Sequence, residues 1–323
     1  MRAIVFPLAL RTASTSRMAT SFRIGTRGSP LALTQANMVR DALAAARGRA
    51  PDDFEIVVIR TTGDRVQDRA LAEIGGKALW TKELDRALLD GDVDCCVHSL
   101  KDVETIRPTQ IVIAATLPRA DVRDRLIGAP TIAALKDGAV VGTSSPRRAA
   151  QLLSIRPDLS IILFRGNVDT RLAKVAAGEA DATLLAAAGL DRLGRGDVGH
   201  AIPVETMLPA PSQGAVAVEV RAEDDAARAM VSAIDCATTC ACVTAERSLL
   251  AELGADCHSA VGALATIEGD MLVLRAELLA EDGSAKVSGE ARGAVGDVET
   301  APALARDLLA RAPASIRRLF AAE

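Results

Sequence analysis

Asp102 is the residue whose surroundings first suggest chemistry in this sequence. It lies near the end of residues 93–103, which begin as a run of small and β-branched residues and end with His98, Ser99, Lys101 and Asp102. The first half of this stretch has the pattern of a buried strand. Groups at the carboxyl end of a strand in an α/β sheet face the crevice in which ligands bind. A single Lys-Asp pair more often opens a solvated turn, so the prediction depends on what else lies nearby.

Positively charged residues recur at predicted loops and helix starts in two separate parts of the chain. If two lobes face each other, these side chains line one cleft. Arginine suits carboxylates because its planar fork makes paired hydrogen bonds. A protein of net charge -4 that gathers arginines in a cleft is expected to bind a polyanionic small molecule. The residues are Arg27, Lys77, Lys101, Arg147, Arg148, Arg165 and Arg171.

Asp102 would be a carboxylate inside this cationic cleft, where the surrounding charges favour its ionised form. Such a group can stabilise a cation that develops in a reaction, or move a proton. Cys257 lies in a predicted exposed loop with Gly254 and Asp256, and is a candidate nucleophile or attachment point. These residues predict a two-lobed protein that binds a carboxylated or phosphorylated small molecule, and they do not specify a reaction.

Two predicted helix starts would present these groups. Ser29 followed by Pro suits an N-cap and a first helical position, and a helix N-terminus offers free N–H groups to an anion. The hydroxyl-rich residues 143–146 predict a second such start. There, Arg147 and Arg148 fall in the first turn, where cations oppose the helix dipole unless an anion is present. This departure from the usual pattern indicates a functional site.

The elements that must position these groups alternate between strands and helices over the first two-thirds of the chain. That alternation predicts an α/β fold, whereas the tail has the pattern of a small α+β unit. Predicted strands are 22–25, 54–61, 111–116, 139–142, 161–164, 182–185 and 215–220, with helices at 31–46 and 80–89. In the tail, helices are predicted at 224–234, 239–253 and 298–312, and strands at 261–267, 271–279 and 285–291.

Three domains are therefore expected, with the Pro/Gly-rich residues 209–214 as a crossover. Domain 1 comprises 21–117 and 214–233, domain 2 comprises 118–213, and domain 3 comprises 234–323 and carries Cys257. Residues 1–20 contain Arg, Ser and Thr but no acidic residue, a composition similar to that of a transit peptide. We favour an extension ahead of Met18 that is disordered or not translated, because a strand begins almost at once.

Composition excludes several classes of protein. With 49% hydrophobic and 25% charged residues, the 323-residue chain is globular. Its negative charge and 2% aromatic content argue against nucleic-acid and membrane partners, and no apolar run reaches the length of a membrane span. Six cysteines without a secreted-type framework favour a reducing, cytoplasmic compartment. Cys236, Cys240 and Cys242 lack zinc-site spacing, so no metal is expected and small buried helix residues are the favoured interpretation.

Taken together, the motifs resemble those of the porphobilinogen deaminase family and occur in the order typical of that family. The resemblance runs from about residue 22 into the third domain, and the ordered set is far more specific than any single motif. The matching segments are 24–33 (IGTRGSPLAL), 75–77 (GGK), 97–103 (VHSLKDV), 142–148 (GTSSPRR), 165–171 (RGNVDTR) and 213–215 (QGA).

This resemblance implies a transferase of tetrapyrrole and haem biosynthesis. Enzymes of the family join four porphobilinogen molecules head to tail, release ammonia at each step, and free hydroxymethylbilane by hydrolysis. They carry a dipyrromethane cofactor attached through a thioether to a cysteine, which Cys257 matches, and Asp102 matches the catalytic carboxylate. The family also implies two α/β domains similar to periplasmic binding proteins around a cleft, a small C-terminal α+β domain, and a monomer.

The resemblance divides the remaining site residues by ligand. It implies that the cofactor is bound by Lys101, Thr143, Ser145, Arg147 and Arg148. It implies that the substrate and the growing chain are bound by Arg27, Ser29, Lys77, Arg165, Arg171 and Gln213. The sequence departs from the family pattern at Glu104, where proline is usual, and at Asp256 and His258 beside Cys257.

Two other functions remain open at this point. A non-catalytic two-lobed binder of a carboxylated molecule would need the same cationic cleft. A phosphate-handling transferase would use the same helix starts, although the sequence lacks the P-loop pattern at its predicted strand ends.

Overall fold

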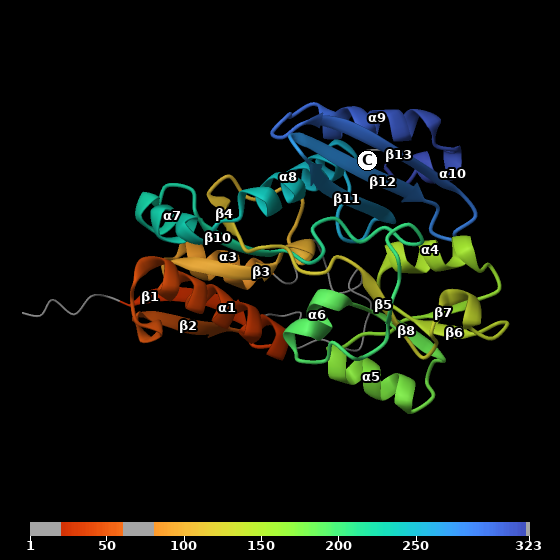
Figure 1. Ribbon diagram of the computed structural model, residues 1–323, viewed down its shortest axis with the longest axis horizontal. Helices are drawn as coiled ribbons and strands as arrows, with labels where there is room; N and C mark the ends of the chain where they lie inside the picture. The colour runs from red at the N-terminus through yellow and green to blue at the C-terminus, as the bar shows by residue number, and fades with distance from the viewer. Residues whose placement is uncertain (1–20, 61–80, 321–323) are drawn as a thin grey trace, which may run out of the picture.

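The computed structural model describes residues 21–60 and 81–320, and three β-sheets organise them (Figure 1). The first sheet has the strand order β2-β1-β3-β10-β4, and β10 runs antiparallel to both of its neighbours. Its apolar residues, such as Ile24, Val97 and Val218, are fully or almost fully buried under helix α1, as expected for strands covered on both faces. The elements are β1 (Phe22–Arg27), α1 (Pro30–Arg47), β2 (Phe54–Ile59), α3 (Lys82–Leu89), β3 (Cys95–Ser99), β4 (Ile111–Thr116), β10 (Val216–Arg221) and α7 (Asp225–Val231).

The second sheet repeats this arrangement with different strands. Its order is β7-β6-β8-β5-β9, and β5 runs antiparallel to both neighbours. Leu126, Val141, Leu152 and Leu184 form the centre of its core. The elements are β5 (Asp124–Ile127), β6 (Val140–Gly142), α4 (Pro146–Ile155), β7 (Ser160–Ile162), α5 (Val168–Ala176), β8 (Ala182–Ala186), α6 (Ala187–Arg192) and β9 (His200–Ala201).

Two crossover segments exchange strands between these sheets. Residues 117–123 run from β4 of the first sheet to β5 of the second, and residues 202–215 run from β9 of the second sheet to β10 of the first. Each crossover thus leads into the strand that runs antiparallel to its neighbours in the sheet it enters. The crossovers touch where Ala120 N–H donates to Gly214 O at 3.2 Å. Gly214 has φ 86°, and a Cβ there would lie 2.6 Å from Ala120 O. The expected return of residues 215–220 to the first sheet is confirmed by the pairing of β10 with β3 and β4.

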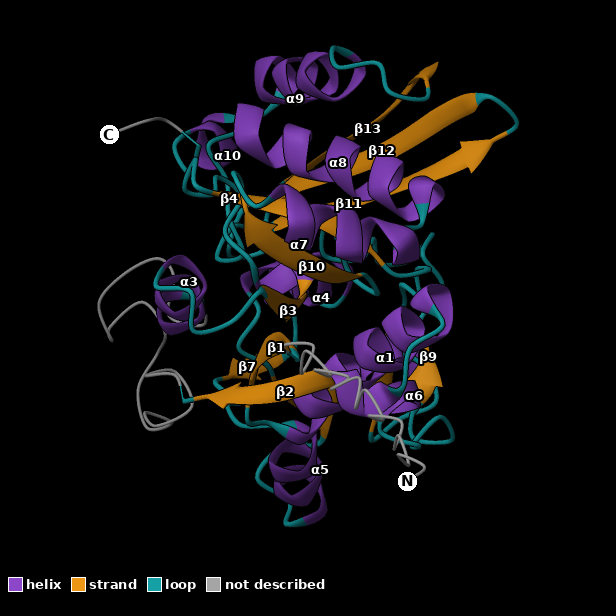
Figure 2. Cartoon of the chain, turned by 90° about the vertical axis from the view of Figure 1, so that its left-hand side faces the viewer, coloured by secondary structure: helices purple, strands orange, loops and turns teal. Residues whose placement is uncertain are grey.

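The third sheet is an antiparallel meander, β11-β12-β13, covered by helices. Helix α8 contacts α9 and β11 on one side and β4 of the first sheet on the other, and Figure 2 shows it lying along the third sheet. Together with the first two sheets, this unit confirms the predicted α/β fold with an α+β tail. The elements are α8 (Ala237–Glu252), β11 (Val261–Glu268), β12 (Met271–Leu279), β13 (Lys286–Ala294), α9 (Thr300–Arg311) and α10 (Ala314–Arg317).

Several local predictions are wrong. The strand predicted at 161–164 ends at Ile162, and the following Phe164 turns into the core. The short elements β5, β9, α6 and α10 have no counterpart in the predictions because they are too brief to show a periodic pattern. Of the three helix cysteines, only Cys242 is buried, whereas Cys236 is the N-cap of α8 and Cys240 is half-buried.

Some predictions lie outside the described residues, namely the extension 1–20, Gly75-Gly76-Lys77 and Trp80. Within the described ranges, no group of three His, Cys, Asp or Glu side chains is placed to hold a metal ion. No single described helix is long and apolar enough to cross a membrane, while the bent pair Asp225–Ile234 and Ala237–Glu252 passes that test by length and composition only.

Glu246 joins the crossovers to the third unit. This buried carboxylate on α8 accepts Arg119 Nη1 at 2.7 Å and Nη2 at 3.0 Å, and also the backbone N–H groups of Ser212 at 2.5 Å and Ala265 at 2.7 Å. Arg119 and Ser212 belong to the two crossovers, and Ala265 belongs to β11. Ser212 has φ 65°, a left-handed conformation that costs free energy unless its surroundings hold it.

We expect Glu246→Ala to lower the free energy of unfolding by roughly 3–5 kcal/mol, because it leaves a largely buried guanidinium and two buried N–H groups unpaired. Urea unfolding followed by circular dichroism measures this loss. The matched control is Glu252→Ala on the same helix, whose partner Arg306 is exposed, with an expected loss of at most about 1 kcal/mol. Equal losses in the two variants would contradict the role given to Glu246.

Candidate active site

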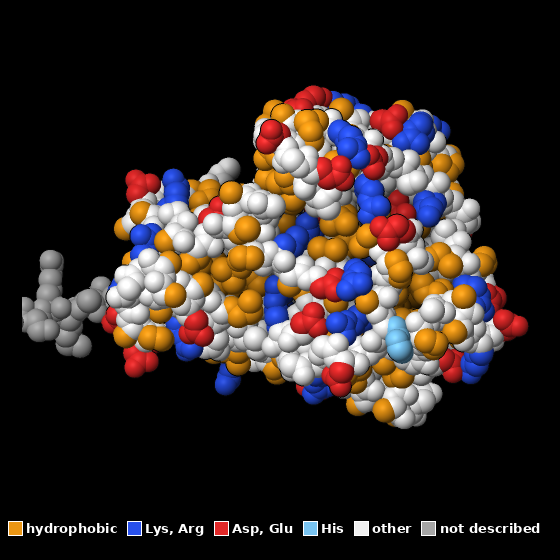
Figure 3. Space-filling model, viewed as in Figure 1, with side chains coloured by type: hydrophobic (Ala, Val, Ile, Leu, Met, Phe, Trp, Pro, Cys, Tyr) orange, Lys and Arg blue, Asp and Glu red, His pale blue; other side chains and the backbone are white. Residues whose placement is uncertain are grey.

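A cleft of about 780 Å³ lies where the three units meet, and it gathers most of the predicted site residues. Eight arginine and lysine side chains line the described part of this cleft against three carboxylates. On the face shown in Figure 3, by contrast, acidic and basic side chains are interspersed. The cleft is therefore strongly cationic. The predicted residues that line it are Arg27, Ser29, Lys101, Asp102, Ser145, Arg147, Arg148, Arg165, Arg171, Gln213 and Cys257.

One predicted residue within the described ranges, Thr143, does not line the cleft. Thr143 is buried behind it, where its Oγ1 accepts the N–H of Ser145 at 3.1 Å. Thr143 thus shapes the turn before α4, and its hydroxyl is turned to the backbone. Lys77 lies outside the described residues, so its position stays a prediction.

Three helices begin at the cleft, and each is capped by a side chain that lines it. Ser29 caps α1, Ser145 caps α4 and Asn167 caps α5. The cap oxygens accept backbone N–H groups of their own helices at 3.3, 3.4 and 2.9 Å. The first turns of α1 and α4 contain no acidic residue. Free N–H groups and dipole ends therefore add to the cationic side chains, an arrangement that favours an anion.

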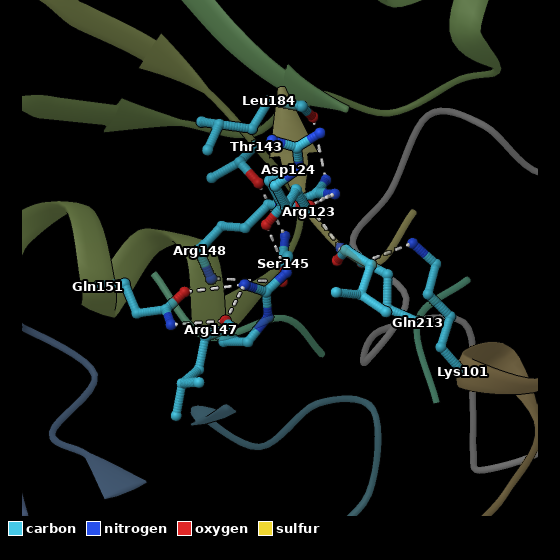
Figure 4. Close-up of polar contacts among 12 residues, drawn as sticks. Lys101, Arg123, Asp124, Thr143, Ser145, Arg147, Arg148, Gln151, Leu184 and Gln213 are labelled. Atoms are coloured by element: carbon cyan, nitrogen blue, oxygen red, sulfur yellow. Dashed lines mark hydrogen bonds and ion pairs between the residues drawn. The ribbon is translucent and has the colours of Figure 1, made fainter. Parts of the chain in front are cut away.

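Arg147 and Arg148 in the first turn of α4 share one buried carboxylate, that of Asp124 (Figure 4). Arg147 Nη2 lies 2.9 Å from Asp124 Oδ2, and Arg148 Nη2 lies 2.7 Å from Oδ1. Burial opposes ionisation of Asp124, but the two guanidinium groups outweigh it and hold the pKa of this carboxyl well below its usual range. The protein itself thus supplies part of the negative charge that the start of α4 requires. This corrects the interpretation that the two arginines need the charge of a bound ligand.

Gln213 connects this ion cluster to Lys101. Its amide nitrogen donates to Val122 O at 2.7 Å and to Asp124 Oδ1 at 2.9 Å, and its oxygen accepts Lys101 Nζ at 3.1 Å. Burial, with repulsion from Arg148, lowers the pKa of Lys101 to about 8. A carboxylate bound beside Lys101 would raise this pKa again, because an opposite charge favours the ionised form.

Arg165 and Arg171 also line the cleft, and Arg165 has an N–H group without a partner in the described residues. Arg171 Nη2 donates to Ser144 Oγ at 3.1 Å and its Nε donates to Gly166 O at 3.0 Å. Burial, with repulsion from Arg148, lowers the pKa of Arg171 to about 10. Arg165 Nη1 is buried without a hydrogen-bond partner in the described part of the chain. An unpaired buried N–H is costly, so this group fits an acidic ligand.

Asp102 ends a 3-10 turn, Leu100–Asp102, that directly follows β3. Its side chain is exposed to the cleft, and none of the hydrogen bonds within the described ranges reaches its carboxylate. The negative charge of Asp102 helps to raise the pKa of Cys257 and opposes the lowering of the pKa of Arg171. Within the described residues, Asp102 is therefore a carboxylate without a hydrogen bond, in one cleft with the arginines and the Cys257 thiol.

Cys257 lies in the loop after α8 and is exposed to the cleft, as predicted. The cleft walls raise the pKa of its thiol to about 12, mainly by desolvation, with Asp102 and Asp256 adding to the effect. Asp256 Oδ1 accepts the N–H of His258 at 2.8 Å, and Ser259 Oγ accepts the N–H of Asp256 at 3.1 Å. These bonds make the loop compact. The Asp256 carboxylate, one of the unusual neighbours of Cys257, stabilises the loop by accepting a backbone N–H.

Two contacts tie the Asp102 turn to the Cys257 loop. Thr105 Oγ1 donates to Ala255 O at 2.7 Å. Arg247 on α8 donates from Nη1 to Val103 O at 3.3 Å and from Nη2 to Thr105 O at 3.0 Å. The separation between carboxylate and thiol is thus set by direct bonds between the first and third units.

Sequence reasoning missed several residues here. Arg60, Ser144, Asn167 and Arg247 line the cleft, and Asp124 anchors its floor. Asn167 could have been found from capping preferences, because it precedes a helical pattern. Asp124 and Arg247 give no local signal, since their partners lie far away in the chain.

We expect Asp124→Asn to destabilise the fold by about 3 kcal/mol at neutral pH, because it leaves two buried guanidinium groups without their counter-ion. The folded-state pKa of Asp124 lies below its unfolded value of about 3.9, so its stabilisation is present above that pH and is lost as the pH falls. Urea midpoints measured between about pH 6 and about pH 3 should therefore show the gap between wild type and variant narrowing. The control Asp90→Asn removes an exposed partner of the exposed Arg86 and should leave the midpoint nearly unchanged. A gap that widens toward low pH would contradict the assignment.

Comparisons with known protein families agree with this geometry. The family model "Porphobilinogen deaminase, dipyromethane cofactor binding domain" matches residues 22–229, and "Porphobilinogen deaminase, C-terminal domain" matches residues 240–312. Among solved structures, the Bordetella pertussis BvgS periplasmic VFT2 domain has a TM-score of 0.37 and 16% identity over 67% of this chain and 87% of that chain, a likeness too slight to add to the sheet topology.

Curated relatives extend over nearly the whole chain. The porphobilinogen deaminase of Sphingopyxis alaskensis is 57% identical over 93% of this chain and 96% of its own length. Those of Paracoccus denitrificans and Nitrobacter hamburgensis are 50% and 47% identical, over 90% and 92% of this chain and 95% and 96% of their own lengths. The chain therefore belongs to the porphobilinogen deaminase family.

Proposed function

We propose that this protein is a hydroxymethylbilane synthase, which joins four porphobilinogen molecules head to tail with loss of ammonia and then releases hydroxymethylbilane by hydrolysis. The observation that supports it most directly is a free carboxylate, Asp102, that faces the same cationic cleft as the exposed thiol of Cys257. A non-catalytic binder of carboxylated molecules is not favoured, because it needs the cations and has no use for the carboxylate or the thiol.

The cleft fits a dipyrromethane cofactor, whose acidic side chains would meet an excess of cations. Lys101, Ser145, Arg147 and Arg148 are the residues that would bind its carboxylates, and Cys257 would form the thioether. When bound, the cofactor supplies the pyrrole carbon to which the first substrate unit is joined. All four of these side chains belong to residues that line the cleft, which supports this role.

Arg27, Ser29, Arg165 and Arg171 would bind the acetate and propionate groups of the incoming substrate. The guanidinium groups hold a carboxylate in a fixed plane, and the N-terminus of α1 adds free N–H groups beside it. The Ser29 hydroxyl accepts a backbone N–H and can still donate its proton to a carboxylate. Gln213 would act through Lys101 and Asp124, to which its amide is already bonded. A role for Lys77 stays a prediction.

Asp102 would be the catalytic residue. When the aminomethyl group of porphobilinogen loses ammonia, positive charge spreads over the pyrrole of that substrate. The carboxylate oxygens of Asp102 stabilise this charge and accept the proton released when the new carbon–carbon bond forms. A carboxylate without another partner keeps its full charge for this purpose.

We also propose a cytoplasmic monomer with the three domains 21–117 with 214–233, 118–213 and 234–323. The free state of all six cysteines is in keeping with a reducing compartment. The strands of each sheet support the domain division. In particular, β10 follows the strands of the second sheet in the sequence and yet belongs to the first sheet.

Asp102→Ala should lower turnover of porphobilinogen by roughly a hundredfold or more, because general acid–base and electrostatic terms of that size are lost together. The measurement is uroporphyrin absorbance after acid and oxidation of the product. Asp90→Ala, which removes an exposed carboxylate at the end of α3, is the control and should keep wild-type turnover. An active Asp102→Ala protein would exclude the catalytic assignment.

Cys257→Ser should be purified without the covalent mass of two pyrrole units, since a serine hydroxyl does not replace the thiol in forming a thioether. Intact-protein mass spectrometry of protein from cells reads this directly. Cys240→Ser removes a half-buried cysteine from α8 and should retain the mass. The attachment site is wrong if the added mass persists in Cys257→Ser.

A further inference from the structure

A cluster of buried charges lies behind the Asp102 turn, and Arg107 is at its centre. The Arg107 side chain is only 8% exposed. It donates from Nε and Nη2 to the two carboxylate oxygens of Glu219 at 2.8 and 2.9 Å, and from Nη1 to Glu104 Oε2 at 2.6 Å. Its Nη2 also reaches Asp85 Oδ1 at 2.5 Å. One guanidinium therefore joins three carboxylates from α3, the loop after β3, and β10.

Residues of this cluster lie on both sides of Asp102 in the sequence. Before the turn, β3 pairs with β10, and His98 Nε2 on β3 lies 3.2 Å from Glu219 Oε2 without the geometry of a hydrogen bond. After the turn, Glu104 accepts Thr81 Oγ1 at 2.6 Å as well as Arg107. Glu219 lies on β10, paired with β3, and is completely buried. The backbone before Asp102 is thus held by the pairing of β3 with β10, and the backbone after it is held through Arg107 by the buried carboxylate of Glu219 on β10.

The cluster is not explained by stability. Three carboxylates share one guanidinium and one imidazole in a dry site, where desolvation commonly offsets the attraction between charges. Burial raises the pKa of Asp85, which shows the cost of keeping this group there. Nor does the cluster meet a ligand, because Asp85, Arg107 and Glu219 are absent from the cleft lining in the described ranges. The feature it does control is the conformation of residues 98–107.

That conformation matters because the Asp102 carboxylate has no hydrogen bond of its own within the described ranges. A side chain without partners is placed only by its backbone, and a displacement of about 1 Å at a reacting group can cost about a hundredfold in rate. A partner on the carboxylate itself would compete with the charge that Asp102 must stabilise.

We infer that Glu104 and Arg107 are positioning residues, which with Glu219 and His98 hold the Asp102 turn so that its carboxylate faces the cleft while remaining unpaired. This rests on the proposed catalytic role of Asp102. Glu104, Arg107 and Glu219 act from behind the turn, since none of them lines the described part of the cleft.

The test compares two ion pairs at opposite ends of β3, in the loaded holoenzyme. Glu104→Ala should lower kcat about tenfold, while KM stays within about twofold and the covalent mass on Cys257 is retained. Glu104→Gln keeps the size of the side chain and part of its hydrogen bonding, so its kcat should lie between those of wild type and Glu104→Ala. Asp94→Ala is the control, because it breaks the Arg23–Asp94 pair at the start of β3 with similar exposure of the carboxylate, 21% against 19% for Glu104. It should lower the melting temperature and leave kcat within about twofold.

Unchanged kcat in both Glu104 variants would overturn the inference, and so would equal losses of kcat in Glu104→Ala and Asp94→Ala. A loss confined to KM would instead place Glu104 in binding, which also overturns it. If Glu104→Ala does not fold, the kcat and KM of Glu104→Gln test the inference in its place. Failure of the proposed function is recognised separately, since Asp102→Ala would then remain active.

Discussion

The carboxylate of Asp124 is the charge on which the cleft depends. It stands between two arginines that occupy the start of α4, where cations would otherwise repel each other and the helix dipole. Through Gln213 it also fixes Lys101, which belongs to the first sheet's unit. One buried anion thus sets the positions of three cations from two units. All three cations line the cleft, so the site is ordered before any ligand enters it.

The exchange of strands between the first two sheets gives this arrangement its frame. Asp124 begins the strand that enters the second sheet from the first crossover, and Gln213 lies on the crossover that returns. The cation cluster therefore sits where the two units are joined by the chain itself. Glu246 fastens the same two segments to α8, which leads to the Cys257 loop. The groups expected to act on the substrate are connected through buried charges rather than through the apolar cores of the separate units.

Local features of the sequence predicted much of this molecule. The Ser-Pro helix starts, the strand before Lys101-Asp102 and the exposed loop of Cys257 follow from short-range preferences, and the structure has them at those places. The unusual Arg147-Arg148 pair indicated a missing anion, and the structure supplies one within the protein. Its counter-ion could not be predicted, because Asp124 lies more than twenty residues away on a strand too short to recognise. The same holds for Arg107 and Glu219, which are 112 residues apart.

The raised pKa of Cys257 has a consequence for the newly made chain. Oxidants attack the thiolate form of cysteine, and a thiol with a pKa of about 12 supplies almost none of it near neutrality. The thiol is therefore protected from peroxide mainly by its desolvation in the cleft, with the charges of Asp102 and Asp256 adding to the effect. Reaction at this sulfur then depends on the strength of the electrophile that reaches it.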